Sequence, residues 1–478
     1  MRKAIYEWAW AAGIGLGLLF AVGTNSWAGK LEDALLENKQ ITIDQWMAVK
    51  AEEEKREAKA LQEGRGATGL PLRERWYEKI SIRGYAQFRY NYTVNNDLLQ
   101  SSSTDRSIGD NNEFFIRRGR LVISGQPHER VFIYLQPEFA GLVGGTEQVA
   151  GLRDFYTDIF LTENKEWRLR AGLSKIPYGF ENVQSSQIRL AFDRNDALNS
   201  GVVNERDLGI FLYYTPTVVR ERFRRLVDSG LKGSGDYGML GIGVYNGQGI
   251  GIRDRNKNKH VVFHATYPYE FPNGQMIQFG MDAYTGQVNV STQPIIPVTP
   301  ITSTSTGQRL TFNPLLHNDG NYLDQRIAWH FILYPQPFGL QAEYTIGRGP
   351  ELNTDRNEIV PGNIRGGYVQ LFYHYKCDTF CLSIFPYVRY QEYFGGKKFE
   401  ANSPRNSVRE LELGIEYQIS KALELTVAGT FTSRNTSDGQ FSPGSCTNTL
   451  PGINIPCVQT PYERQTGNLL RFQLQWNF

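Results

Sequence analysis

Arginine residues at alternating positions are the part of this sequence with the clearest capacity for chemistry. Arg168 and Arg170 are two residues apart, and Arg83 and Arg89 are six apart. Side chains separated by an even number of residues point to one face of a β-strand, so each pair would share a face. A guanidinium group is a permanent cation that binds carboxylates and phosphates through paired hydrogen bonds. The spacing therefore indicates either an anion-binding surface or a set of ion pairs, provided that strands position these residues.

Enzymatic and metal chemistry finds no support in the sequence. It contains no GxSxG, no HExxH and no glycine-rich phosphate loop. Of the six histidines only His260 and His264 are close, and four residues along a strand separate them by about 13 Å, too far to share a metal ion. The formal net charge is +2, which points to no nucleic-acid partner. We expect no enzymatic activity, no bound metal and no cofactor.

The last ten residues predict the type of strand that could carry such arginines. One face of this segment is apolar and consists of Leu470, Phe472, Leu474, Trp476 and Phe478. The opposite face is polar and consists of Arg471, Gln473, Gln475 and Asn477. An apolar face with aromatic residues opposite a wholly polar face is typical of a barrel strand between lipid and water.

The N-terminus carries an export signal. Arg2 and Lys3 precede an apolar run over residues 11–22, and the sequence around Ser26 and Ala28 suits signal peptidase. We therefore assign residues 1–28 to a signal peptide that is cleaved after Ala28. The alternative is a membrane anchor, but a helical span needs about 20 apolar residues.

The composition agrees with an exported protein that is rich in β-strands. The mean hydropathy is −0.42, and no segment after the signal is apolar enough for a helical span. With 13 % aromatic residues, 48 glycines and only 5 methionines, the chain suits many twisted strands better than a helical core. A large secreted β-protein remains an alternative on composition alone.

Residues 29–76 differ from the rest of the chain and predict a helical or coiled-coil segment followed by a linker. Thr42 and Gln45 form a capping box, and Ile43, Trp46 and Met47 share a helix face. This segment could form a small helical hairpin or an oligomeric coil, or it could be a solvated spacer.

Residues 77–478 predict one domain of sixteen strands, because segments of strand character alternate with turns over the whole range. The predicted strands are 79–92, 113–125, 129–139, 153–162, 167–175, 207–214, 235–246, 258–269, 275–286, 323–334, 338–347, 364–376, 380–392, 407–419, 422–433 and 468–478. The last strand should close a barrel against the first.

The gaps between these strands alternate between short turns and long loops, the long ones including 93–112, 176–206, 287–322 and 434–467. Outer-membrane barrels have short periplasmic turns and longer extracellular loops. The gap 215–234 is long where a short turn is expected. It is either a short basic helix at the periplasmic rim or, as we favour, a solvated loop.

The lipid around such a barrel would send charged side chains inward, because a charge facing lipid at mid-membrane costs about 2 to 4 kcal/mol. The inward arginines would be Arg83, Arg89, Arg168, Arg170, Arg326, Arg389 and Arg471. Basic rings along a pore favour anions. The same rule turns several carboxylates inward, namely Glu138, Asp154, Asp158, Glu343, Glu410, Glu412 and Glu416. Ion pairing across the wall is therefore an open alternative to anion selectivity.

Two further features concern the placement of charge. Arg117 and Arg118 are adjacent and cannot both face inward without a bulge or a position near the rim.

The loop 176–206 carries Arg189 and Arg194 together with the carboxylates Glu181, Asp193 and Asp196. Long loops often carry function, so this loop is the candidate for a constriction inside the barrel. The alternative is a surface loop with solvated charges.

The four cysteines form two close pairs, Cys377 with Cys381 and Cys446 with Cys457. In an oxidising compartment each pair predicts a local disulfide. Zinc binding at the first pair would need further ligands, and only His374 is near.

Three runs of the sequence resemble the phosphate-selective porin O and P family of Gram-negative outer membranes. They are Phe114-Phe115-Ile116-Arg117-Arg118-Gly119-Arg120-Leu121, Leu173-Ser174-Lys175-Ile176-Pro177-Tyr178-Gly179-Phe180-Glu181 and Phe192-Asp193-Arg194. The resemblance extends over roughly residues 79–478, and the helical N-terminal segment is similar to the periplasmic extension of many members.

This resemblance implies an all-β fold, a sixteen-stranded antiparallel transmembrane β-barrel with a short N-terminal periplasmic helical segment, that forms homotrimers. It implies inward loops that constrict the pore, and arginines and lysines that conduct anions. Among the basic residues of this sequence, we expect solute contacts at Arg83, Arg89, Lys175, Arg189 and Arg194. The terminal Phe478 matches the signal by which the assembly machinery recognises such barrels.

The expected function is passive diffusion of small hydrophilic solutes through the outer membrane, in contact with its lipid, with a preference for anions that could extend to phosphate. Because the inward charges are mixed in sign, phosphate preference is the weaker part of this expectation. The alternative is a structural or adhesive barrel with a plugged lumen.

Overall fold

The computed structural model describes most of the chain from Lys79 to Phe478. The described residues are Lys55, 79–96, 112–143, 146–202, 206–295, 303–308, 313–354, 356–377, 379–436 and 463–478. The chain divides into two units, Met1–Lys79 and Ile80–Phe478, and every strand of the described residues lies in the second. The predicted signal peptide and almost all of the predicted helical segment lie outside the described residues.

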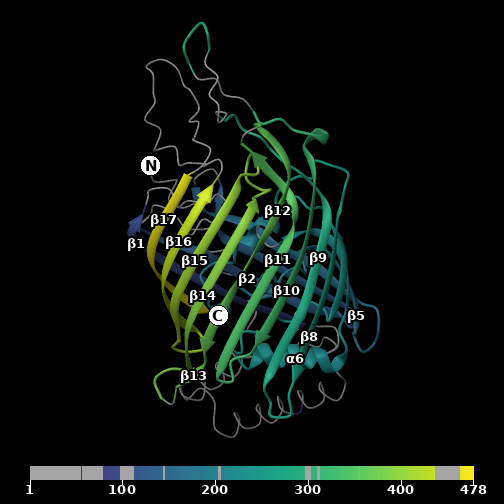
Figure 1. Ribbon diagram of the computed structural model, residues 1–478. Coiled ribbons are helices and arrows are strands. Elements are labelled where there is room, and N and C mark those ends of the chain that lie inside the picture. Colours follow the sequence, from purple (N-terminus) through teal and green to yellow (C-terminus); the bar gives the residue numbers. More distant parts are fainter. Residues whose placement is uncertain are drawn as a thin grey trace, which may run out of the picture. The chain divides into compact units, whose positions relative to one another are not determined.

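The second unit is a closed antiparallel β-barrel (Figure 1). Its sheet has seventeen segments, of which the two-residue β13 (Tyr375–Lys376) follows β12 directly, so the wall has sixteen strands and the predicted number is confirmed. The wall strands are β1 (Ile80–Asn96), β2 (Phe114–His128), β3 (Val131–Val143), β4 (Thr146–Phe160), β5 (Trp167–Lys175), β6 (Arg206–Tyr214), β7 (Leu240–Tyr245), β8 (His260–Glu270), β9 (Met276–Asn289), β10 (Asn321–Leu333), β11 (Phe338–Asn353), β12 (Glu358–Tyr373), β14 (Ser383–Gly396), β15 (Arg405–Gln418), β16 (Leu423–Thr436) and β17 (Glu463–Asn477).

The barrel closes where the last strand pairs with the first, as predicted. β17 and β1 are antiparallel and in continuous register from Tyr85, opposite Asn477, to Thr93, opposite Leu469. The terminal residue extends this pairing, because Gly84 and Phe478 exchange two backbone hydrogen bonds of 2.8 and 3.0 Å. A closed barrel has no free strand edge, so every wall strand satisfies its backbone groups within the sheet.

The two faces of the wall differ in polarity in the way that the alternation predicts. In β10, the side chains of Leu323, Ile327 and Trp329 are 39–45 % exposed on the outer face. Between them, Asp324 and Arg326 are at most 1 % exposed and point inward. Apolar side chains therefore face the membrane, and charged side chains face the lumen.

The connections are unequal at the two ends of the barrel. At one end short turns join the strands, such as 129–130 between β2 and β3. At the other end lie the long connections, such as 176–205 between β5 and β6. Two connections at the long-loop end are nevertheless short, 144–145 and 354–357. There the strand pairs β3–β4 and β11–β12 continue beyond the predicted ends, since antiparallel hydrogen bonds need no apolar alternation to persist.

The gap 215–234 contains an α-helix, α6 (Thr217–Asp228), so the favoured prediction of a solvated loop was wrong. Val219, Phe223 and Leu226 form its buried face. Arg222 donates to the Tyr267 hydroxyl at 3.1 Å, and Arg225 pairs with Glu270. One face of α6 therefore has apolar residues at helical spacing, and its basic residues bind the neighbouring β8. No helix within the described ranges is long and apolar enough to cross a membrane.

Cys377 and Cys381 form a disulfide in the connection between β13 and β14. The second predicted pair, Cys446 with Cys457, lies outside the described residues.

The outer face gives a depth-dependent prediction for stability. Leu413 lies on the outer face of β15, midway along the outward apolar side chains between Leu411 and Tyr417. We expect Leu413→Arg to lower the free energy of unfolding by about 2 to 4 kcal/mol, because the charge would face lipid. Ser407→Arg, on the same face near the long-loop end, should cost less than about 1 kcal/mol. Urea unfolding in phospholipid vesicles measures both, and equal losses would contradict the assignment of faces.

Candidate functional site

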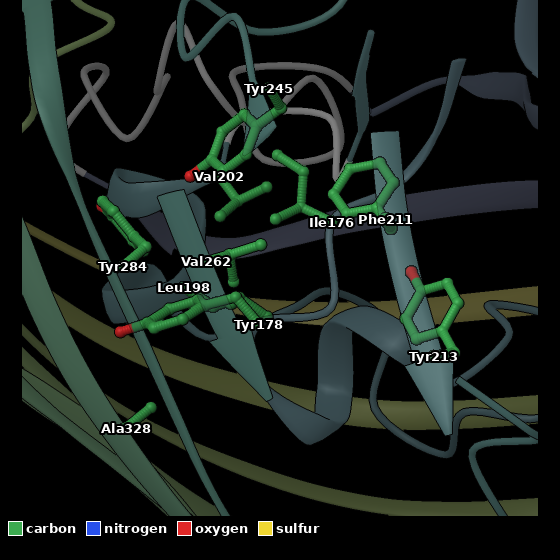
Figure 2. Close-up of a cluster of buried hydrophobic side chains, with 10 residues drawn as sticks. All are labelled: Ile176, Tyr178, Leu198, Val202, Phe211, Tyr213, Tyr245, Val262, Tyr284 and Ala328. Atoms are coloured by element: carbon green, nitrogen blue, oxygen red, sulfur yellow. The ribbon is translucent and has the colours of Figure 1, made fainter. Parts of the chain in front are cut away.

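The loop between β5 and β6 folds into the barrel. It contains the short helices α4 (Phe180–Val183) and α5 (Asp196–Gly201), whose residues are all buried. Figure 2 shows the cluster in which Ile176, Tyr178, Leu198 and Val202 of this loop meet the inner faces of β6 to β10. The apolar side of the loop therefore packs against β6 to β10, and its polar side faces the other strands of the wall. We call residues 176–202 the inward loop.

Two carboxylates of the wall fix the start of the inward loop. The backbone N–H of Gly179 donates to Asp282 at 2.9 Å, and that of Glu181 donates to Glu343 at 3.1 Å. Gly179 has a φ of 82°, and a Cβ there would lie 2.8 Å from Leu198 Cδ1 and 2.9 Å from Glu343 Oε1. Only glycine fits this turn without displacing the side chains that hold it.

Glu181 is the central carboxylate of the inward loop and is fully buried. It forms a bidentate ion pair with Arg389 of β14, with distances of 2.5 and 3.1 Å. It also accepts a hydrogen bond of 2.8 Å from the backbone N–H of Asn195. Burial alone would raise the pKa of Glu181, but the positive charge of Arg389 outweighs burial and lowers it. Glu181 is therefore ionised at neutral pH.

Asp193 joins the inward loop to three strands. It pairs with Arg89 of β1 at 3.3 Å, with Arg117 of β2 at 3.4 Å and with Arg471 of β17. The pairing of β1 with β2 passes from Gln87 opposite Arg118 to Phe88 opposite Ile116, so Arg117 is the extra residue of a β-bulge. The bulge allows two adjacent arginines to face inward.

A second loop also folds inward, and sequence reasoning missed it. Lys397, which follows β14 directly, pairs with Asp196 of α5 at 2.8 Å. The next residue, Lys398, pairs with Asp324 of β10. Burial lowers the pKa of Lys398 to about 8, and Lys397 holds the pKa of Asp196 low although burial opposes this. Adjacent lysines directly after the glycine pair at residues 395–396 were the available signal.

Ion pairs also cover the wall from β4 to β6. Arg170 forms two hydrogen bonds with Asp158, at 2.7 and 2.8 Å, and Arg168 pairs with Asp236 at 3.0 Å. Arg206, which the sequence analysis did not single out, pairs with Asp154 at 2.9 Å. The interior is therefore mixed in charge, and pairing occupies most of the inward arginines.

Two inward arginines differ from the others, since neither forms an ion pair with a carboxylate of the described residues. Arg118 is 5 % exposed and donates to the Gln87 side chain at 2.7 Å. Arg189 of the inward loop is 7 % exposed, and within the described part of the chain none of its three guanidinium nitrogens has a hydrogen-bond partner. The charges of Arg117, Arg189, Arg120 and Arg89 all act on Arg118. We call Arg118 and Arg189 the free arginine pair.

The other predicted site residues have structural partners or lie at the rim. Lys175 donates to the backbone carbonyl of Gln184 at 2.8 Å, and Arg194 donates to Asn182 at 3.2 Å. Arg326 pairs with Asp324 at 3.0 Å, and Arg83 is exposed at the short-turn end of β1. No group of His, Cys, Asp or Glu in the described ranges could hold a metal ion.

A closed barrel with an apolar outer face, a charged interior and a long loop folded inside is an outer-membrane porin. The model of the family "Phosphate-selective porin O and P" matches residues 88–440. The chain belongs to this family, and its location is the outer membrane of a Gram-negative bacterium.

Three solved outer-membrane proteins are similar to this chain at low identity. OmpT of Vibrio cholerae, in a trimer form, is 9 % identical, with 84 % of this chain and 99 % of OmpT covered at a TM-score of 0.45. DcaP of Acinetobacter baumannii is 13 % identical, with 84 % and 97 % covered at 0.45. An anion-selective porin from Comamonas acidovorans is 13 % identical, with 84 % and 99 % covered at 0.42. No curated protein matches the sequence. The family assignment therefore rests on the match over residues 88–440.

The pair of Glu181 with Arg389 can be tested by a double-mutant cycle. Arg389→Met should lower the free energy of unfolding by about 3 to 5 kcal/mol, because Glu181 would remain buried without its counter-charge. Adding Glu181→Gln should recover much of this loss. Arg348→Met, at an exposed arginine of the outer wall, is the matched control and should change stability by less than about 1 kcal/mol. Urea titration measures these three variants and the single Glu181→Gln that completes the cycle, and additive single losses would contradict the coupling.

Proposed function

We propose that this porin allows passive diffusion of small hydrophilic solutes with a preference for anions. The observation that carries this proposal is the free arginine pair. Arg118 comes from the wall and Arg189 from the inward loop, and both are buried without a carboxylate partner among the described residues. A buried cation is costly unless a counter-charge is near, so a diffusing anion would be stabilised there.

We propose solute contacts at fewer residues than the full set of inward arginines. Arg89, Arg168, Arg170, Arg326, Arg389 and Arg471 each have a carboxylate within 4.0 Å. Their fields are largely neutralised, so they line and stiffen the lumen. Phosphate is one candidate solute, because a guanidinium pair can donate several hydrogen bonds to an oxyanion.

A structural or adhesive barrel with a plugged lumen is the second candidate. It is favoured by the extent to which the inward loop fills the interior, with bonds to β1, β14 and β17 as well as apolar contacts with β6 to β10. Conductance separates the two functions. Purified protein in a planar bilayer should pass ion current, and its absence would favour the plugged barrel.

Further parts of the proposal follow from the family. The porin would act as a homotrimer, would be recognised through Phe478 by the assembly machinery, and would have no catalytic role. Native mass spectrometry of the detergent-solubilised protein tests the trimer directly.

Selectivity should depend on the free arginine pair. One charge attracts an anion 5 Å away in water by about 0.8 kcal/mol, so Arg118→Gln with Arg189→Gln should lower the chloride-to-potassium permeability ratio by about threefold to tenfold. The reversal potential in a potassium chloride gradient measures this ratio. Arg348→Gln removes the same charge from the outer wall and should leave the ratio unchanged.

The same recordings separate anion preference from phosphate preference. Added inorganic phosphate should reduce the chloride current of the wild type more strongly than that of the double variant. An unchanged permeability ratio in a double variant that still folds and conducts would refute the assigned role of the pair.

A further inference from the structure

The outer wall between β8 and β12 contains a groove of about 710 Å³. Phe263, Ile327 and Ile346 line its apolar part and are 39–44 % exposed. Ala283 lies in register between Phe263 on β8 and Ile327 on β10. Because alanine is small, a hollow remains between its larger neighbours. We call this surface the wall groove.

Polar and basic side chains border the wall groove on the side of the long loops. The next row of residues in register toward those loops is Thr285, Gln325, Arg348 and Asn363. Arg365 ends the apolar row, opposite Ile346. All five residues line the groove. Its surface is therefore apolar on one side and hydrogen-bonding and positive on the other.

The two arginines of the wall groove are exposed, and neither forms an ion pair with a carboxylate of the described residues. Arg365 lies over the Phe394 ring, with its Cζ 5.5 Å from the centroid. The outward carboxylate Glu392 instead accepts a hydrogen bond of 3.5 Å from Tyr344. Two positive charges at this place remain available to an anionic partner.

The depth of these arginines identifies the region of the membrane that they face. Between Tyr373, near the short-turn end of β12, and Arg365, the outward residues include Leu371 and Val369. Eight residues of a tilted strand span about 20 Å along the barrel axis, and the apolar band of such barrels is about 25 Å tall. Arg365 therefore lies at the border of that band nearer the long loops. Long loops are extracellular in these barrels, so this border faces the outer leaflet.

We infer that the wall groove binds a phosphorylated lipid of the outer leaflet. One acyl chain would lie over Phe263, Ile327 and Ile346, and the lipid phosphate would lie between Arg348 and Arg365. Gln325 and Asn363 would donate hydrogen bonds to the polar part of the same lipid. Charge complementarity favours this occupant over a second copy of the chain, because the described lining of the groove offers two outward cations, Arg348 and Arg365, and no acidic residue. The inference requires only that the barrel lies in the membrane, and it is independent of anion preference in the lumen.

Binding can be measured by native mass spectrometry of the full chain in a non-ionic detergent. The probe is lipid A, an acylated glucosamine disaccharide with two phosphates, and the comparison is the same lipid after dephosphorylation. The wild type should bind the phosphorylated form more tightly. Arg348→Gln with Arg365→Gln should weaken its binding about tenfold, since each arginine near a lipid phosphate contributes several-fold. Arg409→Gln, at an exposed arginine of β15 beyond the groove, is the matched control and should bind as the wild type does.

A steric variant tests the apolar part of the wall groove. Ala283→Phe should fill the hollow and weaken lipid binding to a similar extent, while Ala342→Phe, about 13 Å farther along β11 than Ile346, should not. Ala283→Leu replaces Ala283→Phe if the larger side chain prevents folding, as judged by the change in gel mobility on heating.

Several outcomes would overturn the inference. Equal affinity for the dephosphorylated lipid, or unchanged binding by the arginine double variant, would exclude phosphate recognition. Displacement of the lipid by inorganic phosphate alone would identify a free-anion site. If Ala283→Phe converts an oligomer to monomers, and the wild type binds the dephosphorylated lipid as well as the phosphorylated one, the wall groove is a contact between copies of the chain.

Discussion

The cost of placing a charge against lipid governs the arrangement of this barrel. Because the outer face excludes charge over most of its height, the strands turn their arginines and carboxylates inward. Inside, those groups leave bulk water and need counter-charges. The inward loop supplies several of them: Glu181 to Arg389, and Asp193 to three arginines of β1, β2 and β17. The loop and the wall therefore stabilise each other, and neither arrangement is explained without the other.

This mutual pairing changes how the selectivity of the lumen should be understood. A count of inward arginines overstates the positive field, since Asp158 and Asp324 neutralise their neighbours Arg170 and Arg326 within 3.0 Å. What remains is local and depends on single residues. The free arginine pair brings one cation from β2 and one from the inward loop, so the field that a solute meets depends on the position of that loop.

The sequence predicted the wall much better than the interior. A period of two identifies a strand and assigns its faces, so the sixteen strands and the closure of β17 against β1 could be predicted. The partners of the inward loop could not, since Glu181 and Arg389 are 208 residues apart and no local pattern links them. The loop that contains Lys397 was missed for the same reason. In α6, the apolar spacing of a helix was present, but the density of arginines favoured a solvated loop until their partners on β8 were known.

The alternation of side chains between the two faces of a strand also explains why arginines have opposite surroundings inside and outside the wall. Arg326 on β10 points inward and binds Asp324, whereas Arg348, one row away across the β10–β11 pair, points outward at the edge of the apolar band. A shift of one residue in β10 would turn Arg326 toward lipid, and the same shift in β11 would turn Arg348 into the lumen. The register of β10 and β11 thus keeps the charge that needs a protein carboxylate inside the barrel, and the charge that can reach a lipid headgroup outside it.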